Sequence, residues 1–100
     1  MLNAVEDRVP RYAAADRDSI FDYIEADNPC AAVIVDGRIA ANIRRLEMFA
    51  ETGRPGRVAG TRELVISGTP YSAAYRVTDA TMLILRILHS AQLWPEDFAG

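Results

Sequence analysis

The spacing of apolar residues changes near residue 61, and this change limits the folds open to the chain. Before it, apolar side chains recur every three or four residues over 11–26 and again from Pro29 onward, which predicts two amphipathic helices. After it, apolar and polar residues alternate over 62–66 and 71–77, while 81–89 is apolar on both faces, which predicts three strands. Two helices followed by three strands predict an α+β fold.

The segments between these elements support the same order. Asp27-Asn28-Pro29 separates the helices, because asparagine caps helix N-termini and proline suits the first helical position. Residues 52–61 hold three glycines and a proline, which predicts a loop. Val5 to Val9 is typical of a short first strand. We therefore expect the order β-α-α-β-β-β, in which a helical hairpin packs on a small antiparallel sheet and the last strand is the most buried.

The second helix is expected to turn one apolar stripe toward the core. This stripe comprises Val35, Ile39, Ile43, Leu46 and Phe49. Gly37 interrupts the helix, where glycine is less favourable than alanine, and is expected to mark a close approach to the first helix.

Length and composition indicate one globular domain. The chain has 100 residues, of which half are hydrophobic and a quarter charged. We expect one domain over 1–100, with 90–100 as a C-terminal tail. Apolar runs are far shorter than the roughly 20 residues of a membrane span. Cys30 is the only cysteine, so no intrachain disulfide can form, and the cytoplasm is the expected location.

Charge is distributed unevenly along the chain. The net charge is -3, yet residues 54–92 carry five arginines against Glu63 and Asp79, which gives this segment a charge of +3. Such a surface suits an acidic partner but is weak for a nucleic-acid-binding domain. All eleven basic residues are arginine, so no lysine amine is present for Schiff-base or general-base chemistry.

Six short motifs occur in a recognisable order. They are SIFDYI at 19–24, DNP at 27–29, GRPGR at 53–57, GTREL at 60–64, AYRV at 74–77, and ILRILH at 84–89 followed by WP at 94–95. Together they resemble the ParE branch of the RelE/ParE toxin superfamily, from about Val9 to Phe98. Each motif alone is weak, but their order makes the resemblance specific.

The resemblance implies the toxin of a type II toxin-antitoxin system, which inhibits DNA gyrase by binding it. A ParD-like antitoxin would neutralise the toxin in a hetero-oligomer, and contact with DNA would come only through that antitoxin. No membrane, metal or cofactor is implied. The residues expected to contact partners are on the basic strands and in the tail: Arg62, Arg76, Arg86, Trp94 and Phe98.

Two other functions remain open. The first is a ribosome-dependent mRNA endoribonuclease, as in the RelE branch of the superfamily. In such an enzyme, Arg76 and Arg86 would stabilise the phosphate and His89 would serve as acid or base. The lysines of that branch are absent, and the tail offers no tyrosine. Alternatively, the chain is a non-toxic remnant that only binds its antitoxin.

Each candidate residue also has a structural explanation. His89 could hydrogen-bond across the sheet or cap a backbone carbonyl, and Arg76 and Arg86 could each pair with a nearby acid, Glu63 or Asp79. The Arg62-Glu63 pair is expected to be a solvated strand end. Cys30, in the first turn of the second helix, is expected to be incidental, because no motif places a histidine beside it.

Overall fold

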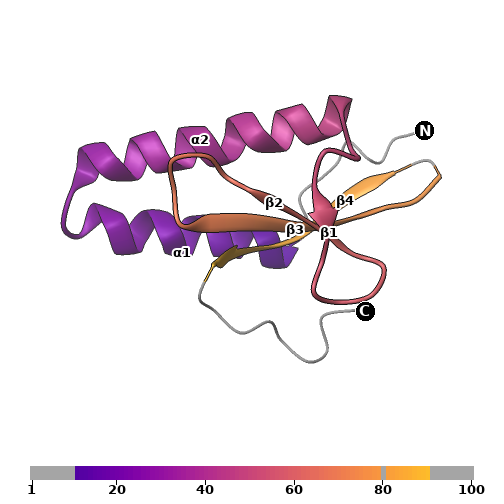
Figure 1. Cartoon of the computed structure of the whole chain (residues 1–100). Coiled ribbons are helices and arrows are strands. Elements are labelled where there is room, and N and C mark those ends of the chain that lie inside the picture. Colours follow the sequence, from indigo (N-terminus) through magenta and orange to yellow (C-terminus); the bar gives the residue numbers. More distant parts are fainter. Residues whose placement is uncertain (1–10, 80, 91–100) are drawn as a thin grey trace.

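The structure, a computed structural model, describes residues 11–79 and 81–90. Within them, α1 (Arg11–Glu25) and α2 (Pro29–Met48) form a helical hairpin, followed by β1 (Arg54–Pro55), β2 (Arg62–Val65), β3 (Tyr71–Val77) and β4 (Met82–His89). The strands form one antiparallel sheet in the order β1-β2-β3-β4 (Figure 1). The predicted α+β architecture is confirmed. The strand predicted at Val5–Val9 lies outside the described residues.

The start of α2 follows the predicted capping pattern. The side chain of Asn28 accepts a hydrogen bond from the backbone N–H of Ala31 at 3.1 Å, and Pro29 occupies the first helical position. The end differs from the prediction. Phe49 is 58% exposed, because α2 ends at Met48 and Phe49 leaves the helix with φ of −132°.

β1 was predicted as part of a loop, and that prediction was wrong. Arg54 pairs with Glu63 and Pro55 with Arg62, so two residues of the glycine-rich segment join the sheet. Two residues are too few for an alternating pattern. Pro55 is tolerated because β1 lies at the edge of the described sheet, where a missing N–H leaves no ladder bond unmade.

The core lies between the helices and one face of the sheet. β3, with strands on both sides, is buried over its first five residues, whereas β4 has exposed positions at Leu83 and His89. The prediction that the last strand is the most buried was therefore wrong. Neither helix of the described ranges has the length and apolar composition needed to cross a bilayer. The buried cluster comprises Ala13, Ile39, Ile43, Leu46, Ile66, Tyr71, Ala73, Tyr75, Met82, Ile84 and Ile87.

Gly37 does not mark a close helix contact. It is exposed, and a Cβ added there would meet no heavy atom within 4 Å. Close approaches occur instead at Gly53, beside the phenol of Tyr75, at Gly56, beside Thr61, and at Gly68, beside the guanidinium of Arg38.

Candidate functional site

One row of residues crosses the whole described sheet on the face opposite the core. Arg54, Glu63, Ala74 and Arg86 lie opposite one another on β1, β2, β3 and β4. Directly paired residues point to the same face, so these four side chains share it. The core side chains of β3 alternate with Ala74 along the strand. We call the face that carries this row the outer face.

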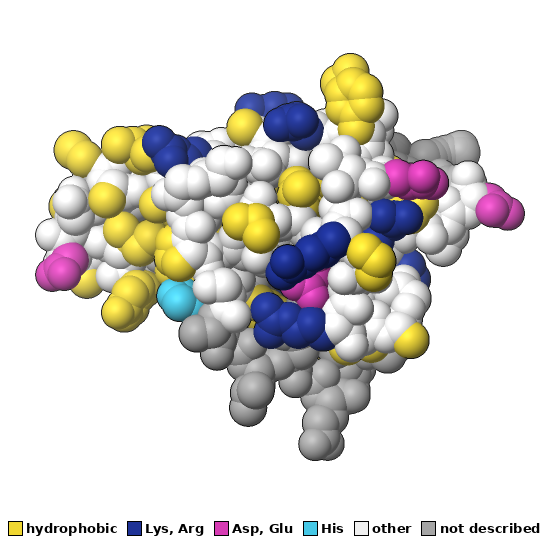
Figure 2. All heavy atoms as spheres, viewed as in Figure 1, with side chains coloured by type: hydrophobic (Ala, Val, Ile, Leu, Met, Phe, Trp, Pro, Cys, Tyr) yellow, Lys and Arg dark blue, Asp and Glu magenta, His cyan; other side chains and the backbone are white. Residues whose placement is uncertain are grey.

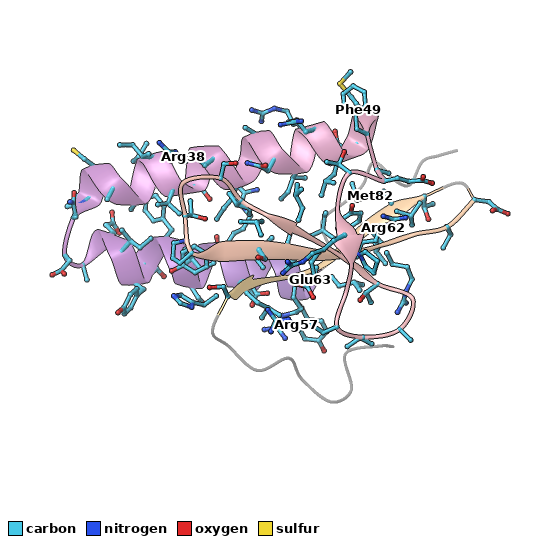
Figure 3. The ribbon with its side chains drawn as sticks, viewed as in Figure 1. Arg38, Phe49, Arg57, Arg62, Glu63 and Met82 are labelled. Carbon is cyan, nitrogen blue, oxygen red and sulfur yellow. The ribbon has the colours of Figure 1, made fainter. Side chains whose placement is uncertain are left out.

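Glu63 is a buried carboxylate at the centre of an arginine cluster. Its side chain is 2% exposed and accepts from the backbone N–H of Arg57 at 2.9 Å. The Nε of Arg57 lies 3.3 Å from one carboxylate oxygen, and Nη2 of Arg54 lies 3.5 Å from the other. Glu63 and Arg57 lie close together beside β1 and β2 (Figure 3). The prediction that Arg62-Glu63 forms a solvated strand end was wrong, because the loop before β2 places Arg57 over the carboxylate of Glu63.

The guanidinium groups around Glu63 remain partly open to solvent. The side chains of Arg54 and Arg57 are 66% and 41% exposed. Figure 2 shows dark-blue arginine side chains on both sides of a recessed acidic side chain near the middle of the molecule. Partly exposed guanidinium groups in fixed surroundings can donate charge-assisted hydrogen bonds to an anionic group on a partner.

Arg62, a predicted partner contact, is anchored to the backbone before β1. Its Nη1 donates to the carbonyl oxygens of Gly53 at 2.7 Å and Glu51 at 3.3 Å. These carbonyls belong to the connection between α2 and β1. Arg62 therefore ties that connection to the sheet, whatever else it contacts.

Arg86 is held by an acid that the sequence did not suggest. Its Nε and Nη2 donate to the two carboxylate oxygens of Asp16 on α1, at 2.7 and 2.9 Å. Asp16 also accepts from the backbone N–H of Ile87 at 2.9 Å. Neither Glu63 nor Asp79, the acids expected from the sequence, supplies this contact. A two-pronged bond of this kind fixes the guanidinium plane.

The register separates the three residues of the endoribonuclease alternative. His89 lies opposite Tyr71, and Arg76 lies opposite Leu83. Tyr71 and Arg76 are five residues apart, about 17 Å along an antiparallel strand. Arg86 and His89 are three positions apart on β4, so strand alternation turns them to opposite faces. The structure therefore does not gather Arg76, Arg86 and His89 around one phosphate.

His89 ends β4 against an aromatic ring. It is exposed, and its ring meets that of Tyr71 edge-on, with centroids 5.5 Å apart and an angle of 85° between planes. Burial raises the pKa of the Tyr71 phenol above its ordinary value, and the nearby phenol of Tyr23 raises it further. Trp94 and Phe98, the predicted aromatic contacts, lie outside the described residues.

The outward side of α2 is a second candidate surface. Several of its large apolar side chains are exposed to solvent: Val33, Ile34 and Met48 are 63%, 55% and 74% exposed. Phe49, directly after the helix, is 58% exposed. Arg38, Arg44 and Arg45 are exposed on the same helix. We call these seven residues the α2 surface. Its mixture of apolar and cationic groups is typical of a surface that binds a partner.

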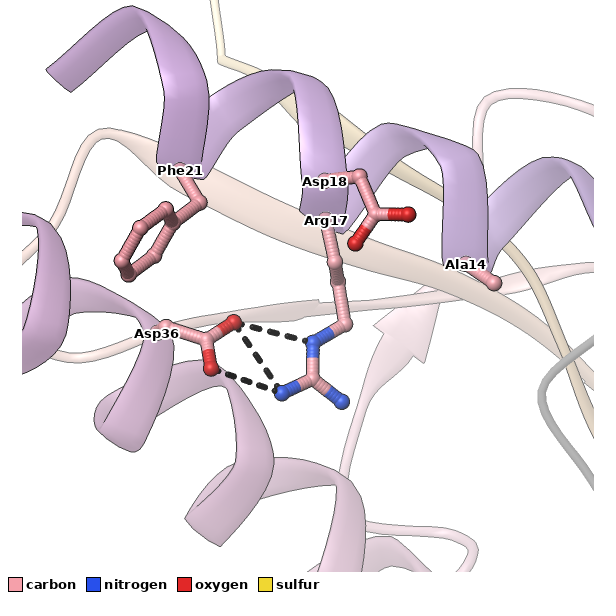
Figure 4. A pocket seen from close by; sticks show the side chains of 5 residues that line it. All are labelled: Ala14, Arg17, Asp18, Phe21 and Asp36. Atoms are coloured by element: carbon pink, nitrogen blue, oxygen red, sulfur yellow. Dashed lines mark hydrogen bonds and ion pairs between the residues drawn. The ribbon is translucent and has the colours of Figure 1, made fainter. Parts of the chain in front are cut away.

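A shallow pocket of about 270 Å³ lies between the helices (Figure 4). Nη2 of Arg17 lies 3.0 and 3.1 Å from the two carboxylate oxygens of Asp36, which joins α1 to α2. Ala14, Asp18 and Phe21 complete the lining. In the described ranges, no three His, Cys, Asp or Glu side chains are grouped to hold a metal ion. Cys30 is exposed at the start of α2.

The chain is similar to known proteins in sequence. Residues 8–94 match the family model described as ParE toxin of type II toxin-antitoxin system, parDE. A Sinorhizobium fredii protein named "Putative toxin Y4kP" is 42% identical over 79% of this chain and 81% of its own length. Toxin RelE2 of Caulobacter vibrioides is 38% identical over 81% of this chain and 90% of its own.

A solved structure has the same fold. It is described as the chromosomal ParDE TA system from P. aeruginosa, and a chain in it is 35% identical with a TM-score of 0.75. The match covers 80% of this chain and 89% of that one.

Proposed function

The chain belongs to the ParE toxin family of type II toxin-antitoxin systems, and we propose that it inhibits DNA gyrase by binding and is neutralised by a ParD-like antitoxin. Family membership over residues 8–94 is the observation that carries this proposal. We infer one toxin domain over 1–100, with 90–100 as a C-terminal tail. A gyrase inhibitor would act in the cytoplasm, where its target is found.

The contacts of the arginines favour a protein that binds its target over one that cleaves a bond. Arg86 is committed to Asp16 and Arg62 to two backbone carbonyls. A phosphate-cleaving site needs cationic groups and an acid aimed at one point. The outer face instead presents the partly exposed guanidinium groups of Arg54 and Arg57 beside the buried Glu63, which suits recognition of an acidic protein surface. Arg76 on the same face and Trp94 and Phe98 in the tail would extend this contact.

The antitoxin would dock on the α2 surface. An acidic, disordered antitoxin segment that folds on binding could lay apolar side chains over Val33 and Ile34 and place its carboxylates near Arg38 and Arg44. Coupled folding and binding of this kind buries roughly 1,000–3,000 Å². The toxin and antitoxin would form a hetero-oligomer, and any DNA contact would be made by the antitoxin.

An endoribonuclease is the second candidate, because one relative carries the name toxin RelE2. The separation of Arg76 and His89 along the sheet argues against it. A chain that only binds its antitoxin is the third candidate.

A pair of assays separates the three candidates. Purified chain is added to a gyrase supercoiling reaction and, in parallel, to an in vitro translation reaction in which message length is followed. We expect supercoiling to stop while message stays intact. Cut message with normal supercoiling would identify an endoribonuclease, and no effect in either reaction would identify the antitoxin-binding remnant.

A further inference from the structure

The side chain of Arg57 spans the outer face from β2 to the end of β4. Its Nε lies 3.3 Å from Glu63 on β2, and its Nη2 donates to the carbonyl oxygen of Ser90 at 3.4 Å. β3 lies between these two strands, so the guanidinium crosses over β3. Ser90 is also held from its other side, because its backbone N–H donates to the carbonyl oxygen of Pro70 at 2.8 Å.

Small residues on β3 leave room for this crossing. Ala74 lies opposite Glu63, and Ser72 lies two positions away on the same face. A larger side chain at either position would occupy the space above the strand. The small side chains of Ser72 and Ala74 therefore leave space on the outer face for the side chain of Arg57 to cross β3.

Glu63 determines where Arg57 lies. The carboxylate binds both the backbone N–H and the Nε of Arg57, so it fixes the residue at two points. The side chain of Glu63 is 2% exposed, so solvent cannot substitute for these donors. A buried charge of this kind persists only with its partners in place. Loss of the charge would release Arg57 without removing any exposed group.

We propose that Glu63 is a positioning residue for target binding: through Arg57 it fixes the outer face and the end of β4 in the one arrangement that the target recognises. The target contact would be made by exposed guanidinium groups, those of Arg54 and Arg57, on an acidic protein segment. This inference rests on the proposed function, in which the antitoxin occupies the α2 surface on the other side of the sheet. Glu63 then affects toxicity and not antitoxin binding.

The test compares Glu63→Gln with Glu25→Gln, a control that removes an exposed carboxylate at the end of α1. Growth arrest on expression in a bacterium measures toxicity whatever the target. Affinity for the cognate antitoxin measures the α2 surface, and amide hydrogen exchange of Arg57 reports its bond to Glu63. We expect Glu63→Gln to weaken growth arrest and to speed Arg57 exchange roughly severalfold, because a hydrogen bond to a neutral amide oxygen is about half as strong as one to a carboxylate. Antitoxin affinity should be unchanged.

Arg57→Lys keeps the inference testable if Glu63→Gln does not fold. Lysine keeps the positive charge, but it lacks the planar fork that reaches Glu63 and Ser90 together. We expect the same loss of toxicity with normal antitoxin binding. Full toxicity of either folded variant would overturn the inference, and so would an equal loss of toxicity and antitoxin affinity, since that indicates a general folding defect. If wild-type chain arrests growth without affecting gyrase, the gyrase proposal fails, while the comparison of growth arrest still decides the role of Glu63.

Discussion

The backbone N–H of Gly53 donates a buried hydrogen bond to the phenol oxygen of Tyr75, 2.8 Å away. Tyr75 lies in the middle of β3 and is fully buried, whereas Gly53 lies between α2 and β1. The bond therefore fastens the connection that delivers Arg54 to the sheet. A side chain at position 53 would clash with the phenol, so glycine is required there.

Tyr75→Phe removes this bond and keeps the ring. The N–H of Gly53 would lose its acceptor inside the core, which destabilises a fold by about 1–3 kcal/mol. Denaturant unfolding should show this loss. The control is Tyr12→Phe, at a position that is 68% exposed and where we expect a change within about 0.5 kcal/mol. Equal stability of Tyr75→Phe and wild type would show that the bond does not contribute.

Two glycines should respond to alanine in opposite directions. Gly37 is helical, exposed and surrounded by open space, so Gly37→Ala should raise the free energy of unfolding by about 0.5–1 kcal/mol. Gly68 has φ of +79°, and its added Cβ would meet the guanidinium of Arg38. Gly68→Ala should lower stability by about 1–2 kcal/mol. Thermal unfolding of both variants checks the pair, and the same sign for both would contradict the prediction.

Stability should fall at alkaline pH through Tyr71. Burial raises the pKa of its phenol in the folded state, with a further increase from Tyr23, so folding favours the protonated form. The contribution is complete below the unfolded pKa of about 10 and is lost as pH rises through the folded pKa. We expect unfolding free energies measured above pH 10 to fall less steeply for Tyr71→Phe than for wild type. Parallel curves would contradict this prediction.

The α2 surface can be tested separately from the outer face. Val33→Asp places a charge in the exposed apolar surface of α2 and should weaken antitoxin binding by roughly tenfold or more. Val65→Asp is the matched control, because Val65 is 53% exposed on β2. Calorimetric titration with purified antitoxin measures both variants. The docking surface is wrongly placed if the two variants lose affinity equally.

The parts of the fold that depend on local spacing could be predicted from the sequence. Helix periodicity and the Asn28 cap are local properties, and alternation defined β3. The two residues of β1 have no period, so only their pairing with β2 makes them a strand. Phe49 continued the apolar spacing of α2 and was assigned to the core, but the helix ends one residue earlier.

The candidate site depended on contacts between distant residues. Arg86 and Asp16 are 70 residues apart, so no local pattern could pair them. The burial of Glu63 depends on where the preceding loop places Arg57. The available signal was a single acid among the three arginines of residues 54–63, a composition that suggests charge pairing but not its geometry.

Equilibrium binding of the purified chain to DNA gyrase tests the central claim most directly. Gyrase is labelled, titrated with the chain, and titrated again with the chain saturated by its antitoxin. We predict saturable binding with a Kd of roughly micromolar or tighter, and its loss in the presence of antitoxin. A chain that arrests growth yet shows no saturable binding to gyrase would contradict the account.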